Sequence, residues 1–299
     1  MSQIQTPGLS QDVCVINDTA YVADNAGGIT VIDILDASNP VYIESWPSVQ
    51  FVKRIKAAPQ NRLVIAYETG GADGVKIYSI DSKQIVAESF DAGLRGLDVM
   101  EYVDSLWIIE TDITEGLRGD LYVDIGFWSW EDGLQWRPAP LGEYRGIVMA
   151  QDTIAFTCLD ERGVMAWSLD LVQTTYPPDS IGWVETPGVA YDVAYQDGYL
   201  YIADYFAGLA VVDASDPTAL NLVAQVVPHG ASRCEKVAVD GTTAAVLDSY
   251  DGIYVFNISI PEAPIVIDRI DLPEPQGLAF SGGRLLVVDA AEGLMIFQP

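Results

Sequence analysis

The sequence predicts an all-β protein, a seven-bladed β-propeller built from four-stranded antiparallel blades. Three observations predict it: a repeat of 39 to 50 residues, apolar runs of strand length separated by turn residues, and an opening segment that matches one in the middle of the chain. A repeat of this length is typical of propellers, whereas a β-sandwich lacks a fixed period. We therefore expect residues 1–299 to form a single propeller domain.

The repeat is clearest where a glycine or another small turn residue precedes alternating apolar residues. Seven such segments, among them GITVID and GLAVVD, begin at residues 28, 74, 124, 163, 208, 252 and 293. Ahead of them lie paired apolar runs split by a polar turn, as in DVAYQDGYLYIAD, which indicates a β-hairpin. A turn rich in Asp, Ser and Pro and a further apolar run such as NLVAQVV follow. Each unit thus predicts four antiparallel strands.

The two ends of the chain are predicted to share a blade. The last unit stops at its third strand, GLMIFQP, and QIQTP near the N-terminus matches WVETP, the fourth strand of another unit. We expect residues 1–9 to complete the blade that begins at about residue 276. This pairing would close the ring and leave no free edge at the seam.

Two units resemble the repeat of the LVIVD-repeat proteins, in which an apolar hairpin precedes Leu-Val-Ile-Val-Asp, then Asp-Pro and a second Pro. GITVIDILDASNPVYI and GLAVVDASDPTALNLV carry the resemblance closely, GIYVFNISIPEAPIVI is similar, and units two to four differ more. The resemblance implies a propeller of the kind common on exported or surface proteins of bacteria and archaea, and no shared activity. The Gly-His and Trp-Asp signatures of WD repeats are absent.

Composition restricts the partners. Lys and Arg number 15 against 43 Asp and Glu, a net charge of −28 that repels phosphate backbones and anionic bilayers, so nucleic acid is not an expected partner. The acidic excess fits solubility, salt adaptation or cation binding. No apolar run approaches the roughly 18–20 residues of a membrane span, so membrane insertion is not expected.

The expected location is extracytoplasmic, on the resemblance and the low lysine content, with the cytoplasm as the alternative. The chain as given carries no secretion signal, because a basic segment followed by an apolar one is missing at its start. Its three cysteines are odd in number and far apart, which predicts neither a disulfide framework nor a zinc site: Cys14, Cys158 and Cys234.

Charged residues open the innermost strands, which surround the channel of a propeller. With their neighbours they form the predicted ligand-binding set: Asp12, Arg54, Asp98, Arg145, Tyr191, Asp192, Glu235 and Lys236. Alternating acidic and basic groups suit a zwitterionic or sugar ligand, or a cation held by the carboxylates. The alternative is that the charges neutralise one another and bind backbone amides.

Unit three carries an insertion, TDITEGLRGDLY, between its second and third strands. A long loop on a rigid scaffold often carries function. The insertion carries Asp112, Glu115, Arg118 and Asp120, of which the three acidic residues are added to the predicted ligand-binding set. Calcium is the one cofactor considered, with Asp98, Asp120 and Asp192 as candidate ligands, although the spacing of the insertion does not match an EF-hand.

Carboxylates also recur where the second strand of a unit ends. They are Asp24, Glu110, Asp204, Asp248 and Asp289. A group repeated in most blades predicts loop capping, because a chemical site is normally asymmetric.

The leading functional hypothesis is a non-enzymatic scaffold that presents its top face to a protein or glycan partner. The top face carries the connections between blades and the turns between second and third strands. Aromatic residues predicted there supply contacts, although blade packing would use the same residue types: Trp46, Phe51, Tyr205, Phe206 and Tyr250.

The alternative is a lyase or hydrolase acting on a sugar or acidic substrate at the channel mouth. Its catalytic residues would be His229, the one histidine of the chain, with Tyr191 and Arg145. These side chains would have to converge on one point. The Gly-x-Ser-x-Gly, phosphate-loop and His-Glu-x-x-His motifs are absent, so the enzymatic status is uncertain and leans against catalysis.

Overall fold

The computed structural model describes residues 1–47, 51–68, 74–90, 96–102, 105–115, 121–129, 133–138, 145–150, 153–168 and 179–298. In these ranges the chain folds into β-strands joined by turns, which pair into seven four-stranded antiparallel sheets. The described ranges contain no helix with the length and apolarity needed to cross a bilayer. The chain divides into two compact units, and each is described by itself.

The first unit comprises residues 1–92 and 271–299 and holds three sheets. One consists of β2 (Asp12–Ile16), β3 (Thr19–Ala23), β4 (Ile29–Asp33) and β5 (Val41–Trp46). The next consists of β6 (Val52–Ala58), β7 (Arg62–Tyr67), β8 (Gly74–Ser79) and β9 (Gln84–Phe90). The third consists of β26 (Pro275–Ser281), β27 (Arg284–Asp289), β28 (Gly293–Phe297) and β1 (Ser2–Ile4).

The second unit, residues 93–270, holds four sheets. The first two are β10 (Gly96–Tyr102), β11 (Ser105–Glu115), β12 (Leu121–Ser129) and β13 (Gly133–Pro138), then β14 (Ile147–Ala150), β15 (Ile154–Cys158), β16 (Val164–Ser168) and β17 (Asp179–Val184). The last two are β18 (Asp192–Gln196), β19 (Tyr199–Ala203), β20 (Leu209–Asp213) and β21 (Asn221–Val226), then β22 (Cys234–Asp240), β23 (Thr243–Asp248), β24 (Gly252–Asn257) and β25 (Ile265–Ile270).

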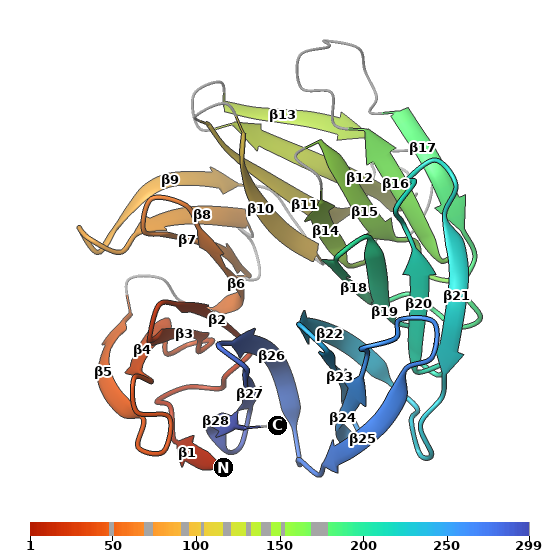
Figure 1. Ribbon diagram of the computed structural model, residues 1–299. Helices are drawn as coiled ribbons and strands as arrows, with labels where there is room; N and C mark the ends of the chain where they lie inside the picture. The colour runs from red at the N-terminus through yellow and green to blue at the C-terminus, as the bar shows by residue number, and fades with distance from the viewer. Residues whose placement is uncertain are drawn as a thin grey trace. The chain divides into compact units, whose positions relative to one another are not determined.

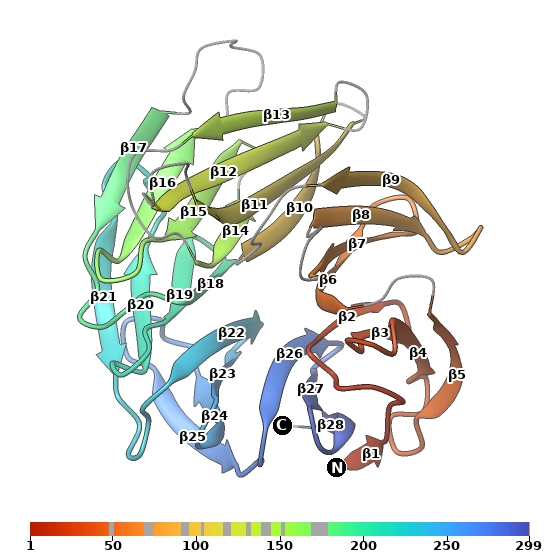
Figure 2. The ribbon, with the colours of Figure 1, turned by 180° about the vertical axis from the view of Figure 1, so that it is seen from behind.

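Within each unit the first strands of neighbouring sheets lie against one another. In the first unit β2 contacts both β26 and β6, and in the second unit β10, β14, β18 and β22 follow one another in order (Figure 2). The two middle strands of a sheet are its most buried part: Leu200 to Ala203 of β19 and Leu209 to Val212 of β20 are almost wholly buried. Apolar packing between sheets therefore fixes where the loops at their ends project.

The predicted pairing of the chain ends is confirmed. β1 lies antiparallel to β28, with Ser2 opposite Ile296 and Ile4 opposite Leu294 (Figure 1). The N-terminal segment thus supplies the fourth strand of the sheet that begins at Pro275. This pairing covers the edge that β28 would otherwise expose.

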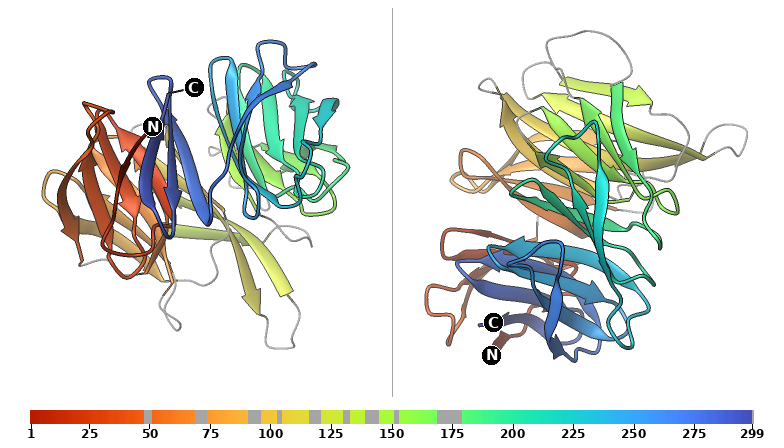
Figure 3. Two further views of the ribbon diagram at one scale, coloured as in Figure 1. Left: turned by 90° about the horizontal axis from the view of Figure 1, so that it is seen from below. Right: turned by 45° about the vertical axis from the view of Figure 1, so that its right-hand side comes forward.

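The predicted count of seven blades is wrong. Six sheets have strands of three to seven residues, as the repeat predicts, and these sheets form six blades. In the β10–β13 sheet, β11 is 11 residues long and β12 is 9, and their pairing continues to Glu115 opposite Leu121 (yellow to yellow-green in Figure 3). Much of the insertion predicted as a loop is therefore strand, because its threonine and isoleucine residues favour a hairpin.

Candidate functional site

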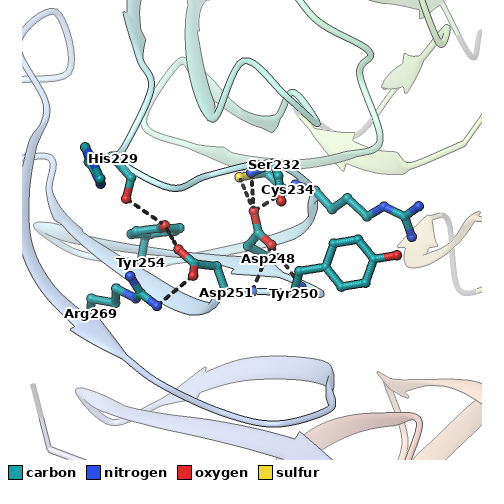
Figure 4. A network of polar contacts seen from close by, with 9 residues as sticks. His229, Ser232, Cys234, Asp248, Tyr250, Asp251, Tyr254 and Arg269 are labelled. Carbon is teal, nitrogen blue, oxygen red and sulfur yellow. Dashed lines mark hydrogen bonds and ion pairs between the residues drawn. The ribbon is translucent and has the colours of Figure 1, made fainter.

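Carboxylates that end the second strands cap the adjoining loops, as predicted. Asp204 is fully buried and accepts hydrogen bonds from the Gly188 amide at 2.9 Å and the Thr186 hydroxyl at 2.8 Å. Asp248 accepts four, from the amides of Ser232, Arg233, Tyr250 and Asp251 (Figure 4). Asp24 and Asp289 bind loop amides in the same way, from Gly8 and from Glu274, Ala291 and Glu292. These carboxylates hold the loops in place.

Three aspartates of the predicted ligand-binding set join neighbouring sheets. Asp12 accepts the amide of Ile55 at 3.2 Å, Asp98 that of Met149 at 2.7 Å, and Asp192 that of Val237 at 3.1 Å. In each case the carboxylate lies at or near the start of the first strand of one sheet and the amide lies on the first strand of the next. This arrangement gives the three carboxylates a structural role. Arg54 lies on β6 and Lys236 on β22.

Aromatic and arginine side chains gather at one end of the sheets of the second unit. The guanidinium carbon of Arg145 lies 3.9 Å from the ring centroid of Tyr191, which stacks on Tyr205 at 4.7 Å with an angle of 11° between the rings. Phe206 meets Tyr205 edge to face at 6.4 Å and is 55% exposed. Arg145 also forms an ion pair with Asp160, with 2.7 Å between Nε and Oδ1.

A second cation–aromatic pair adjoins this stack. The guanidinium carbon of Arg233 lies 4.2 Å from the ring centroid of Tyr250, a side chain that is 67% exposed. The backbones of Tyr205 and Cys234 exchange two hydrogen bonds, at 3.1 and 3.2 Å, which places Tyr205 beside the residue that follows Arg233. We call the whole set the aromatic–arginine strip: Arg145, Tyr191, Tyr205, Phe206, Arg233 and Tyr250.

The backbone of Tyr205 is in the left-handed region, with φ of 48°. Equivalent residues in two other sheets, Asn25 and Asp160, have φ of 48° and 52° and bridge to the next sheet in the same manner. Asparagine and aspartate tolerate this conformation, whereas a tyrosine there is strained. A strained residue at a conserved geometry suggests that its side chain is required.

Burial shifts the acid–base properties of groups in and beside the strip. It raises the pKa of Asp204 to about 6, although hydrogen bonds from Thr186 and Gly188 act in the opposite direction. It also raises the pKa of Glu235, against the effect of the neighbouring Arg233. The pKa of Tyr191 is raised by burial too, so this phenol keeps its proton at neutral pH and is a poor general base.

His229 belongs to a different group of contacts. Its backbone carbonyl accepts a hydrogen bond from the Tyr254 hydroxyl at 3.2 Å, and this hydroxyl also contacts Asp251, which pairs with Arg269 at 2.6 Å (Figure 4). Its imidazole points away from these partners in the same view. The interactions recorded for the described residues join Arg145 to Tyr191 but do not bring His229 to them. The geometry therefore gives the alternative catalytic set no support.

The described residues give little support to the insertion as a ligand-binding site or to calcium binding. Asp112 and Glu115 lie on β11, opposite Asp124 and Leu121, while Arg118 and Asp120 fall outside the described residues. In the part of the chain that the structure describes, no group of three or more His, Cys, Asp and Glu side chains could hold a metal ion. The three cysteines are free and buried.

The aromatic residues predicted for the top face differ in exposure. Tyr205, Phe206 and Tyr250 lie in the predicted turns, and Phe51 is 41% exposed, but Trp46 is buried and stacks on Tyr78 at 4.9 Å. Arg233 and Asp160 were not among the predicted site residues. The two best-matching repeats lie 180 residues apart, and aligning them places Tyr205 opposite Asn25. This difference is the sequence signal that could have identified Tyr205.

The fold and this site define a β-propeller with an asymmetric group of aromatic and arginine side chains, of which Phe206 and Tyr250 are exposed. The model of the LVIVD repeat matches residues 7–47 and 187–227. The chain thus carries two LVIVD repeats and folds as a β-propeller, which confirms the resemblance seen in its sequence. A search of curated proteins finds no match to this sequence.

Solved structures support the fold alone. A crystal structure of the computationally designed Ika8 protein is similar with a TM-score of 0.70 at 13% identity, over 99% of this chain and 86% of that chain. A chain in a crystal structure of the Mitotic Checkpoint Complex gives a TM-score of 0.73 at 12% identity, over 100% of this chain and 92% of that chain. Identity this low carries no inference about activity.

Proposed function

We propose that the protein is a non-enzymatic binding scaffold that uses the aromatic–arginine strip to hold a protein or glycan partner. The observation that carries the proposal is Tyr205, an aromatic residue kept in a backbone conformation where the equivalent positions have Asn25 and Asp160. Its ring joins the stack between Tyr191 and Phe206. A propeller needs no catalysis to be useful, and exposed Tyr, Phe and Arg are enriched in binding surfaces.

Several features support a rigid surface. The Asp248 carboxylate fixes the loop that carries Tyr250, and the Asp204 backbone carbonyl accepts the amide of Ala207 in the turn that carries Phe206. The Tyr205–Cys234 backbone pair ties one sheet to the next. Side chains ordered before a ligand arrives lose less conformational entropy on binding. We extend the proposal to an extracytoplasmic or surface location, which rests on the LVIVD resemblance and low lysine content.

The proposal is tested with Phe206→Ala and Tyr250→Ala, which remove the most exposed rings of the strip. Binding to a partner purified from the native source, or to a glycan array, should weaken about tenfold or more in either variant, as for aromatic residues central to an interface. Thermal unfolding should change little, because both side chains are largely exposed.

Leu35→Ala is the matched control, since Leu35 is 67% exposed, belongs to the first unit and lies outside the strip. Its binding should equal that of the wild type. Equal binding by all four proteins would place the interface elsewhere and refute the proposal.

A further inference from the structure

Arg233 differs from the other arginine of the strip in its electrostatic environment. Arg145 is neutralised by Asp160, whereas none of the ion pairs between described residues includes Arg233. The chain has 43 acidic residues and only 15 basic ones, so a basic side chain outside all of these ion pairs is uncommon. Glu235 interacts with the charge of Arg233 but is not among these ion pairs either. The guanidinium is held over an exposed tyrosine instead.

A guanidinium in this position suits a carboxylate ligand. Its N–H donors form a planar fork that matches the two oxygens of a carboxylate, and stacking on a ring orders that plane in advance. Asp248 accepts the backbone amide of Arg233 at 2.8 Å, which fixes the start of the side chain. The carboxylate would therefore meet donors that are already oriented.

The surroundings of Arg233 favour a sugar over a protein segment. Tyr250 lies beneath it, and Glu235 is half-buried two residues along the chain. Phe206 is exposed and meets Tyr205, whose backbone pairs with that of Cys234, the residue after Arg233. Aromatic faces beside charged hydrogen-bonding groups suit the apolar faces and hydroxyls of a pyranose. The core of a protein interface is, in contrast, depleted in acidic side chains such as Glu235 and Asp160.

We propose that the strip binds a glycan bearing a sugar carboxylate, with Arg233 as the carboxylate ligand and Tyr250 and Phe206 as stacking surfaces. The proposal rests on the proposed function of the strip as a binding surface. The net charge of −28 repels polyanions, so the ligand carries a single carboxylate at the site rather than a run of them.

The test is calorimetric titration of the full chain with two pairs of probes, each an acidic sugar and its neutral parent. One pair is cellobiouronic acid and cellobiose, for a uronic acid, and the other is sialyllactose and lactose, for a sialic acid. At least one acidic sugar should bind about tenfold or more tightly than its parent, as a charge-assisted hydrogen-bonded pair implies. Arg233→Gln should lower its affinity to that of the parent.

Arg62→Gln is the control, because Arg62 lies on β7 of the first unit, outside every predicted binding residue, and should leave every affinity unchanged. Equal affinity for the acidic and neutral sugars, or an acidic preference that survives in Arg233→Gln, overturns the carboxylate assignment and leaves the strip a binding surface. Absence of binding to all four sugars at millimolar concentration overturns the glycan assignment. The proposed function itself fails only if Phe206→Ala and Tyr250→Ala also leave every partner bound as before.

Discussion

The two LVIVD repeats, residues 7–47 and 187–227, share one backbone frame and differ in what it displays. In both, a buried aspartate ends the second strand and accepts the amide of a glycine, Gly8 to Asp24 and Gly188 to Asp204. In both, the residue after that aspartate has φ of 48°. The frame is thus fixed by capping and close packing, which tolerate different side chains at the surface.

The displayed side chains are polar or small in the first repeat and aromatic in the second. Where the first repeat has Gln11, Asn25 and Ala26, the second has Tyr191, Tyr205 and Phe206. These three form the continuous stack beside Arg145. On the proposed function, the first copy of the repeat supports the fold alone, whereas the second also supplies a binding surface, at some cost in backbone strain at Tyr205.

The largest loss of stability is expected from adding a methyl group at the glycine that both repeats place against the aspartate. A Cβ added at Gly8 would lie 2.1 Å from the Asp24 carbonyl oxygen, and one at Gly188 would lie 2.1 Å from that of Asp204. Because backbone cannot yield easily, Gly8→Ala and Gly188→Ala should each destabilise the protein by about 3 kcal/mol or more. Chemical denaturation measures both.

Gly241→Ala separates this clash from the general cost of replacing a glycine. Gly241 has φ of 57° and open space around it, so its substitution should cost only about 1 kcal/mol. A mild effect at Gly8 or Gly188 would break the comparison, since the two repeats would then not depend on the same close contact.

A smaller, pH-dependent effect distinguishes the second repeat. Asp204 has a pKa of about 6 in the folded protein against 3.8 ordinarily, so the folded state binds its proton more tightly than the unfolded state. Its contribution should therefore lower the free energy of unfolding as pH rises from about 4 to about 6, by about 3 kcal/mol in all, with no further change above. Comparing wild type with Asp204→Asn over pH 4 to 7 isolates this contribution.

Ala190→Ser sharpens the same measurement. The first repeat has Ser10 at this position, and its hydroxyl lies 3.3 Å from a carboxylate oxygen of Asp24. A hydroxyl donor at residue 190 would stabilise the ionised form of Asp204 and reduce the slope with pH. A wild-type slope no steeper than that of Asp204→Asn would show that burial does not hold a proton on Asp204.

The fold was predictable because the repeat contains residue types that particular backbone conformations require. The turn at Asp197 and Gly198, with φ of 50° and 86°, and the pairing of β1 with β28 follow from residue type and period. The sheet β10–β13 was not predicted correctly, because an insertion between two strands can lengthen the strands or form a loop. Residues such as Ile113 and Val123, paired in the structure, favour the first outcome.

The site was predictable in part. Arg145 and Tyr191 were placed at the same end of the molecule from blade topology, and their direct contact at 3.9 Å follows. The roles of Asp12 and Asp192 could not be decided from sequence, because a carboxylate that binds a ligand and one that binds a backbone amide look alike there. Arg233 was not predicted as a site residue, because its contact with Tyr250 joins two positions that only the folded chain brings together.

The smallest expected effect has an unusual sign. Tyr205→Asn places in the second repeat the residue that the first repeat has at position 25. Since asparagine adopts a φ of 48° with less strain than tyrosine, the variant should gain up to about 1 kcal/mol from the backbone, offset in part by loss of the stack on Tyr191. Binding at the strip should weaken while stability is kept or slightly raised.

Thermal unfolding and titration on the same samples measure stability and binding. Asn25→Tyr is the reverse exchange, which should destabilise the first repeat and create no binding. If Tyr205→Asn is less stable than wild type and binds as well, then the ring is held for packing alone, and the second repeat differs from the first only in its core.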